Sequence, residues 1–226
     1  KDLRTLMIEA RDEKKFLPES EILDWANQLS DALIYLHGQS PAVLHRDIKP
    51  SNIKLTPSGI VKLVDFGLVK ILAPGEVTIT IIQGQGTALY TPLEQYGGDI
   101  GHTDVRSDIF SFASTIYHLL TNKAPTDARQ RFLDPSVLVP IRQINSAVSL
   151  RTEKAVQWGM SLHPDDRPQS VDDFHDSLIG SRPVHIPAGT QSYSKLRAKT
   201  SNTPEIISIL LLSALSLVAL VLTIIG

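Results

Sequence analysis

The stretch Leu44–Asn52, LHRDIKPSN, places an aspartate, a lysine and an asparagine at short spacings directly after a helix-like segment. A second motif with an aspartate, Asp65-Phe66-Gly67, begins thirteen residues after Asn52 and directly follows the strand-like run VKLV. An aspartate can orient a hydroxyl and accept its proton, and carboxylate and amide oxygens are the hard ligands that Mg²⁺ prefers. A nearby lysine can reach a phosphate as a point charge. The spacing therefore indicates phosphoryl transfer, which depends on alignment and charge neutralisation.

The composition excludes several other classes of function. The 226 residues contain no cysteine, so neither a disulfide nor a thiolate metal site can form. The formal net charge of -2 gives no general signal for a nucleic-acid partner. The seven histidines are scattered and show no metal-ligand spacing, and we interpret them as structural or surface residues.

Helical periodicity dominates the chain and predicts a mainly α (α+β) fold. The predicted helices cover residues 21–37, 107–120, 151–162 and 170–179, and Ser170 with Asp173 is typical of a capping box. Short strands are predicted at 42–45, 53–56 and 60–66, with a hairpin turn at 56–59. Residues 70–98 show no clear periodicity and are predicted to form a long loop.

Several motifs occur in an order that resembles the protein kinase family, specifically the bacterial, eukaryotic-like serine/threonine kinases. They are HRDIKPSN, DFG, GTALYTPLEQY, SDIFSFA and HPDDRP. The resemblance covers roughly residues 1–180 and implies a kinase C-terminal lobe. The family's glycine-rich loop, strand lysine and helix glutamate are not found in this sequence. We therefore expect a C-lobe fragment of a longer protein, inactive without the N-terminal lobe.

The resemblance implies catalytic and cofactor roles for four residues. Asp47 corresponds to the catalytic base, and Lys49 to the lysine that contacts phosphate in serine/threonine kinases. Asn52 and Asp65 correspond to the Mg²⁺ ligands. ATP and Mg²⁺ are the cofactors implied.

Other residues receive regulatory or substrate-binding roles from the same resemblance. Arg46 corresponds to the arginine that pairs with a phosphorylated activation loop, and we expect Thr78 or Thr80 to carry that phosphate. Gly86 and Thr87 lie in the loop that faces the substrate.

Two further positions have structural roles in the family. Glu94, in Pro92-Leu93-Glu94 where the family usually has Ala-Pro-Glu, is expected to pair with Arg167. Asp108 resembles the helix aspartate that holds the backbone of the catalytic loop.

The last residues form an apolar segment of membrane-spanning length. No charge occurs from Ile206 to Ile225, and twenty helical residues span about 30 Å, the thickness of the hydrocarbon core. We predict a transmembrane helix at 205–226 after a juxtamembrane linker at 181–204; a buried core helix is the alternative. The basic residues of the linker predict a single pass through the cell membrane, with the kinase lobe in the cytoplasm: Arg182, Lys195, Arg197 and Lys199.

The sequence is compatible with three functions. The first is a membrane-anchored serine/threonine protein kinase that phosphorylates serine or threonine of protein substrates. The second is a pseudokinase-like docking module at the lipid bilayer, and the third is a small-molecule phosphotransferase. Lys49, the Gly86-Thr87 segment and the Glu94/Arg167 pair favour a protein substrate over a small molecule. The sequence leaves open a homodimer, the identity of the substrate and the signal sensed.

Overall fold

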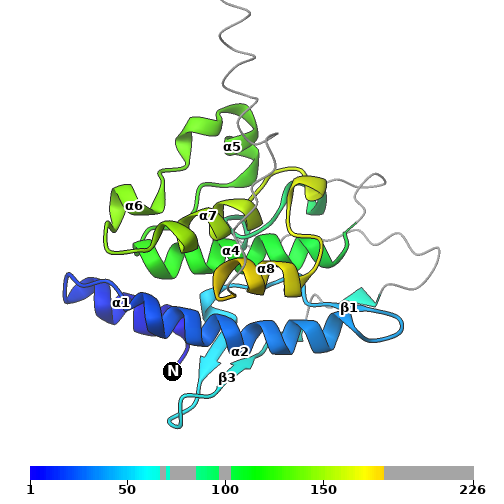
Figure 1. Cartoon of the computed structure of the whole chain (residues 1–226), viewed down its shortest axis with the longest axis horizontal. Coiled ribbons are helices and arrows are strands. Elements are labelled where there is room, and N and C mark those ends of the chain that lie inside the picture. Colours follow the sequence, from blue (N-terminus) through cyan, green and yellow to red (C-terminus); the bar gives the residue numbers. More distant parts are fainter. Residues whose placement is uncertain (67–69, 72–84, 97–102, 181–226) are drawn as a thin grey trace, which may run out of the picture. The chain divides into compact units, whose positions relative to one another are not determined.

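The computed structural model describes residues 1–66, 70–71, 85–96 and 103–180 (Figure 1). The chain divides into two compact units, Lys1–Ile186 and Pro187–Gly226, and all described residues lie in the first. Its α-helices are α1 (Leu3–Asp12), α2 (Glu19–His37), α3 (Gln85–Ala88), α4 (Val105–Thr121), α5 (Ala128–Leu133), α6 (Ile141–Ile144), α7 (Leu150–Gly159) and α8 (Val171–Leu178). The strands are β1 (Val43–Leu44), β2 (Ile53–Leu55), β3 (Val61–Leu63) and β4 (Lys70–Ile71). Short 3-10 helices occur at Pro50–Asn52, Leu93–Gln95, Pro135–Val137 and Pro164–Asp166.

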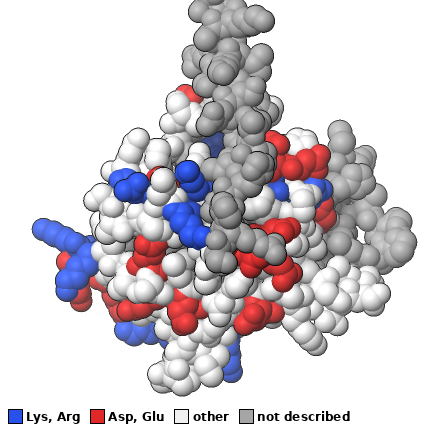
Figure 2. Space-filling model, viewed as in Figure 1, with Lys and Arg blue, Asp and Glu red and all other residues white. Residues whose placement is uncertain are grey.

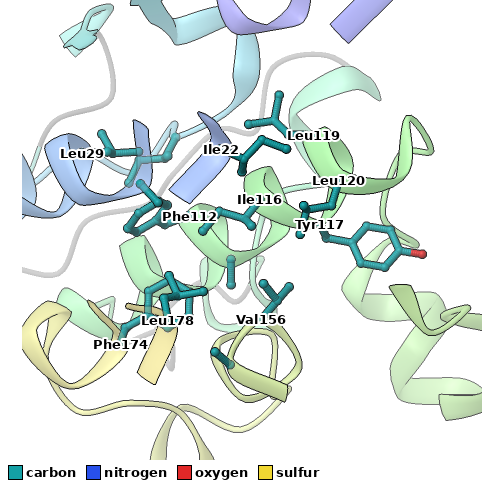
Figure 3. Close-up of a cluster of buried hydrophobic side chains, with 14 of the residues drawn as sticks. Ile22, Leu29, Phe112, Ile116, Tyr117, Leu119, Leu120, Val156, Phe174 and Leu178 are labelled. Atoms are coloured by element: carbon teal, nitrogen blue, oxygen red, sulfur yellow. The ribbon is translucent and has the colours of Figure 1, made fainter. Parts of the chain in front are cut away.

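Helix α4 forms the centre of this unit. Every residue from Ser107 to Thr121 except His118 is buried, as expected for a helix that is covered on nearly all sides. Helices α1, α2, α6, α7 and α8 contact it, and side chains from α2, α4, α7 and α8 interdigitate in the core (Figure 3). Because α4 is packed on so many sides, a side chain that it presents to a neighbouring loop is held in a fixed position.

The predicted long helices are present, with shifted ends. Helix α2 begins two residues before the predicted start and buries Ile22, Trp25, Leu29 and Leu33 on one face. Helix α7 ends at Gly159, three residues before its predicted end. The serine half of the predicted capping box before α8 is confirmed, since Ser170 Oγ accepts a hydrogen bond from the Asp173 amide at 3.1 Å. Ser170 Oγ also donates to Asp173 Oδ2 at 2.8 Å.

Several parts of the chain differ from the expectation, among them α5 and α6, which were not predicted. Helix α1 was not predicted; it is capped by Asp2, whose Oδ1 accepts from the Thr5 amide at 2.8 Å. The stretch 70–98, predicted as a loop throughout, contains β4, α3 and the 3-10 helix Leu93–Gln95. These elements have two to four residues, which is too short to produce a visible period.

The predicted hairpin is confirmed as β2 and β3. The strands pair antiparallel with Ile53 opposite Leu63, and Gly59 in the turn has φ +80°. That left-handed backbone is readily adopted by glycine. Strand β1 pairs antiparallel with β4. Because the hairpin returns the chain to its starting point, the residues before β2 and after β3 lie side by side.

Among the described residues, no helix combines the length and apolarity required to cross a membrane. The predicted span at 205–226, the predicted linker at 181–204, and both Thr78 and Thr80 lie outside the described residues.

Candidate active site

The loop between β1 and β2 is fixed to the core helix by one buried carboxylate. Asp108 of α4 is fully buried, and its Oδ1 accepts from the Arg46 amide at 2.8 Å. Its Oδ2 accepts from the His45 amide at 2.9 Å and lies 2.9 Å from His37 Nε2. Two successive amides of the loop are thus attached to the rigid centre of the molecule. His37 was not singled out from the sequence, because 71 residues separate it from Asp108.

His45 connects this loop to the segment after β3. Its ring is buried, with Nε2 3.2 Å from the Val64 carbonyl oxygen and the ring centre 4.9 Å from the centre of the Phe66 ring in an edge-to-face arrangement. Burial lowers the pKa of His45, so the ring is neutral near pH 7. His45 therefore has a structural role that aligns two segments of the site.

Of the two Asp47 carboxylate oxygens, one accepts hydrogen bonds and the other accepts none from the described residues. Its Oδ2 accepts from Lys49 Nζ at 2.8 Å and from Asn52 Nδ2 at 2.9 Å. Its Oδ1 is buried and has no hydrogen-bond partner among the described residues. A buried carboxylate oxygen without a partner is energetically unfavourable, and a substrate hydroxyl would satisfy it. Lys49 Nζ also donates to Thr87 Oγ1 at 2.9 Å, which connects the catalytic loop to α3.

Asn52 and Asp65 are brought together by the hairpin. The Val64 amide donates to the Asn52 carbonyl oxygen at 2.9 Å, so Asp65 follows directly beside Asn52. The Asn52 side-chain nitrogen Nδ2 donates to the backbone oxygen and to Oδ2 of Asp47, both at 2.9 Å. The side-chain oxygen Oδ1, which accepts only a long hydrogen bond of 3.4 Å from Ser51 Oγ among the described residues, is the end that can face a ligand. Asp65 is exposed and has φ +67°, an uncommon conformation for a residue with a side chain.

This donor set fits Mg²⁺ bound together with a nucleotide. Mg²⁺ commonly takes one or two protein oxygens and completes its shell with phosphates and water. Within the described ranges, no group of three or more histidine, cysteine or acidic side chains could hold a metal alone. The residues present suit a metal that arrives with phosphate ligands.

Arg46 directly precedes Asp47 in the chain and is nearly completely buried. Its backbone has φ +67°, and its Nε has no hydrogen-bond partner in the part of the chain that the structure describes. Burial lowers the pKa of this guanidinium. A buried cation without a full set of acceptors is suited to an anionic partner.

The expected Glu94–Arg167 pair is a bidentate ion pair. Arg167 Nη1 lies 2.6 Å from Glu94 Oε1, and Nη2 lies 3.0 Å from Oε2. Arg167 also donates to the carbonyl oxygens of Ser161, Leu162 and Arg106, and its guanidinium lies 4.9 Å from the centre of the Phe110 ring. The ion pair thereby holds the 3-10 helix Leu93–Gln95 next to α4. This 3-10 helix follows the Gly86-Thr87 segment in α3.

Comparison with known proteins identifies this arrangement. A family model for the protein kinase domain matches residues 2–185. A probable serine/threonine-protein kinase of Clostridium acetobutylicum is 33% identical over 167 residues, which are 70% of this chain and 24% of that protein. A second, from Streptomyces coelicolor, is 31% identical over 186 residues, 76% of this chain and 26% of that protein. The serine/threonine-protein kinase PknB of Mycobacterium leprae is 26% identical over 170 residues, 72% of this chain and 26% of that protein. The chain thus spans about a quarter of the length of these relatives.

Proposed function

Because the chain belongs to the protein kinase family, we propose that it supplies the catalytic loop of a bacterial serine/threonine kinase that transfers the γ-phosphate of ATP to proteins. The observation that carries this proposal is the Asp47 carboxylate, with one buried oxygen free and the other held by Lys49 and Asn52. That arrangement matches the requirement for a positioned base beside a phosphate-binding cation.

The reaction follows from these contacts. The substrate hydroxyl donates its hydrogen bond to Asp47 Oδ1, and its oxygen attacks the γ-phosphorus as the bond to the β-phosphate oxygen breaks. The proton passes to Asp47, and the leaving group is ADP. The hydrogen bonds from Lys49 and Asn52 to Oδ2 keep the carboxylate from rotating, and the Lys49 ammonium compensates negative charge that develops on the phosphoryl oxygens.

Asn52 and Asp65 are the residues that would hold Mg²⁺ in this site. When bound, the metal neutralises the charge of the nucleotide phosphates. The protein contributes the position of these two oxygen ligands, which the β2–β3 hairpin sets.

A direct assay tests the proposal. The protein made from its natural gene is incubated with γ-labelled ATP and Mg²⁺, together with casein as a generic protein substrate. Label is expected on serine and threonine and is expected to disappear when EDTA removes the metal. Label transferred to aminoglycosides or choline but never to protein would favour a small-molecule phosphotransferase instead.

We extend the proposal to location: residues 205–226 span the cell membrane once, with residues 1–204 in the cytoplasm. Lys195, Arg197 and Lys199 lie within about 15 residues of the apolar segment, the range over which positive charge favours the cytoplasmic side. Anionic lipids on that side add an attraction of about 1 kcal/mol per basic residue. The kinase reaction also needs the ATP of the cytoplasm.

Single cysteines test this topology, since the 226 residues contain none. In intact cells, a membrane-impermeant maleimide is expected to label Gly226→Cys but to leave Ser201→Cys unlabelled until the cells are lysed. The parent protein without either substitution gives the background. Labelling of Ser201→Cys in intact cells would reverse the orientation and separate the kinase lobe from ATP.

Regulation by phosphorylation is a further part of the proposal. A phosphate on Thr78 or Thr80 adds up to about two negative charges, and Arg46 offers a buried guanidinium that lacks a full set of acceptors among the described residues. We expect phosphopeptide mapping of the active protein to find one or both threonines phosphorylated. An Asp47→Asn protein made in the same way should carry no phosphate there, since the modification depends on the kinase itself. Two unmodified threonines in active protein would contradict this regulation.

A further inference from the structure

A cavity of about 320 Å³ opens directly beside the acceptor site. It shares Lys49 and Thr87 with the candidate active site and is also lined by Arg4, Tyr90 and His118. None of its lining residues is an aspartate or a glutamate. The lining therefore holds two cations, of which Lys49 is paired with Asp47, whereas Arg4 has no acidic residue beside it in the lining.

Arg4 is available to a ligand. It lies in the first turn of α1, is exposed, and makes no hydrogen bond or ion pair with any other residue that the structure describes. Its neighbour Lys1 differs, because Lys1 Nζ is 2.7 Å from a Glu9 carboxylate oxygen. A free guanidinium can bind a carboxylate through two parallel hydrogen bonds.

The positive charges of Arg4 and Arg11 act on His118, in the wall of the cavity. It is the one residue between Ser107 and Thr121 of α4 that is not buried, and its Nδ1 lies 2.6 Å from the Tyr90 hydroxyl oxygen. Partial burial, together with the charges of Arg11 and Arg4, lowers the pKa of His118 to about 4. His118 is therefore neutral near pH 7, and both arginines act on the wall of the cavity.

The positive charge continues away from the active site. A second, more open cavity of about 650 Å³ is lined by Arg11, Lys14, Lys15 and Lys123, again with no acidic residue in its lining. Arg11 lines this second cavity, and its charge also acts on His118 in the lining of the first cavity. We call Arg4, Arg11, Lys14, Lys15 and Lys123 the basic tract; Lys and Arg side chains gather where α1 ends, at the left edge of Figure 2.

Acidic neighbours neutralise the basic tract only in part. Asp12 lies 3.7 Å from Arg11 Nε, and Glu13 lies 3.1 Å from Lys15 Nζ. The side chains of both pairs are more than half exposed, and such surface pairs contribute little. Five cations against two exposed acids leave the tract positive.

We propose that the basic tract binds acidic side chains of the protein substrate, so that the kinase selects serine or threonine with aspartate or glutamate a few residues away on one side. This inference rests on the proposed kinase function. An extended peptide advances about 3.3 Å per residue, so side chains roughly two to five positions from the acceptor can reach Arg4 and then Arg11. Complementary charge at this distance favours such substrates over neutral ones.

Paired peptides test the selection in the natural gene product. Each peptide has one threonine and a single glutamate at one position from -5 to +5, and its twin has glutamine there. We expect kcat/KM to be about tenfold higher for glutamate than for glutamine at two or more positions on one side only. The ratio should decline towards one in 0.5 M salt, where charges are screened within a few ångströms.

Variants with reversed charge test whether Arg4 and Arg11 cause the preference for glutamate peptides. Arg4→Glu and Arg11→Glu are expected to bring the glutamate/glutamine ratio to about one or lower, and to make lysine peptides better substrates than their glutamine twins. Lys154→Glu is the matched control: it is exposed on α7 and lines neither cavity, and its ratio should equal that of the wild type.

The outcomes separate this inference from the function on which it rests. An active kinase that uses glutamate and glutamine peptides equally would overturn the basic tract as a substrate site but leave the kinase function intact. A preference for phosphoserine twins without any preference for glutamate would assign the tract to phosphorylated substrates and also overturn it. No transfer to any peptide or protein would contradict the kinase function, and this inference with it.

Discussion

Replacing Asp47 by asparagine is expected to lower kcat of the natural gene product by about 10²-fold or more, the amount that a positioned general base contributes. An asparagine oxygen can still accept from Lys49 and Asn52, which hold Oδ2 in the wild type. Its amide nitrogen, however, would replace the free Oδ1 and cannot take a proton from the substrate. Because Asn52 and Asp65, the proposed Mg²⁺ ligands, are unchanged, KM for ATP should remain close to that of the wild type.

Steady-state kinetics with varied ATP and varied protein substrate measure this effect. Asp31→Asn is the matched control, because Asp31 is exposed on α2 and its change should leave kcat unaltered. Amide hydrogen exchange of α4 should be the same in both variants and the wild type, which shows that the fold is intact. Wild-type turnover by the Asp47→Asn protein would remove Asp47 from the role of base.

The long helices were predictable because each buries one regular stripe of apolar side chains. Helix α2 places Ile22, Trp25, Leu29 and Leu33 at helical spacing, and α4 places Ile109, Phe112, Ala113 and Ile116 at the same spacing. Helix α1 was missed although Leu3, Leu6, Met7 and Ala10 stand at the same helical spacing. Helices α5 and α6, with six and four residues, are too short to show a period.

The candidate site was predictable where its residues are close in sequence. Asp47, Lys49 and Asn52 share one short motif, and the hairpin that brings Asp65 to them has a recognisable turn. The φ of +67° at Arg46 could not be predicted, because nothing in an arginine side chain favours a left-handed backbone. Aspartate adopts this conformation more readily, but the sequence does not mark Asp65 for it. Tertiary hydrogen bonds hold the Arg46 amide in place, notably the one to Asp108.

Contacts between distant segments were beyond the reach of sequence patterns. His37 with Asp108 and Tyr90 with His118 depend on how whole helices pack, and a single histidine on a helix carries no periodic signal. Arg4 resembles any solvated charge until the cavity beside Lys49 is seen. The residues that would determine substrate selection are therefore the ones that sequence patterns predict least well.

Replacing Arg167 by methionine is expected to reduce the free energy of unfolding by about 3–5 kcal/mol, the usual cost of removing one partner of a buried ion pair. The Glu94 carboxylate, about nine-tenths buried, would lose both bidentate hydrogen bonds. Three carbonyl oxygens would lose their donor as well, those of Ser161, Leu162 and Arg106. Each unsatisfied buried group adds to the cost.

Asp165→Asn provides a control with an equally short ion-pair contact, made through one hydrogen bond instead of two, and with different burial. The Arg106–Asp165 ion pair has the same 2.6 Å separation as the Arg167–Glu94 pair, but the Asp165 side chain is 72% exposed, so its loss should cost about 0–1 kcal/mol. Hydrogen exchange of the buried α4 amides in the natural gene product measures both effects as a change in opening free energy. Adding Glu94→Gln to Arg167→Met should recover part of the loss, because the buried charge is removed. Equal small effects from Arg167→Met and Asp165→Asn would show that burial of the Glu94 pair does not stabilise this fold.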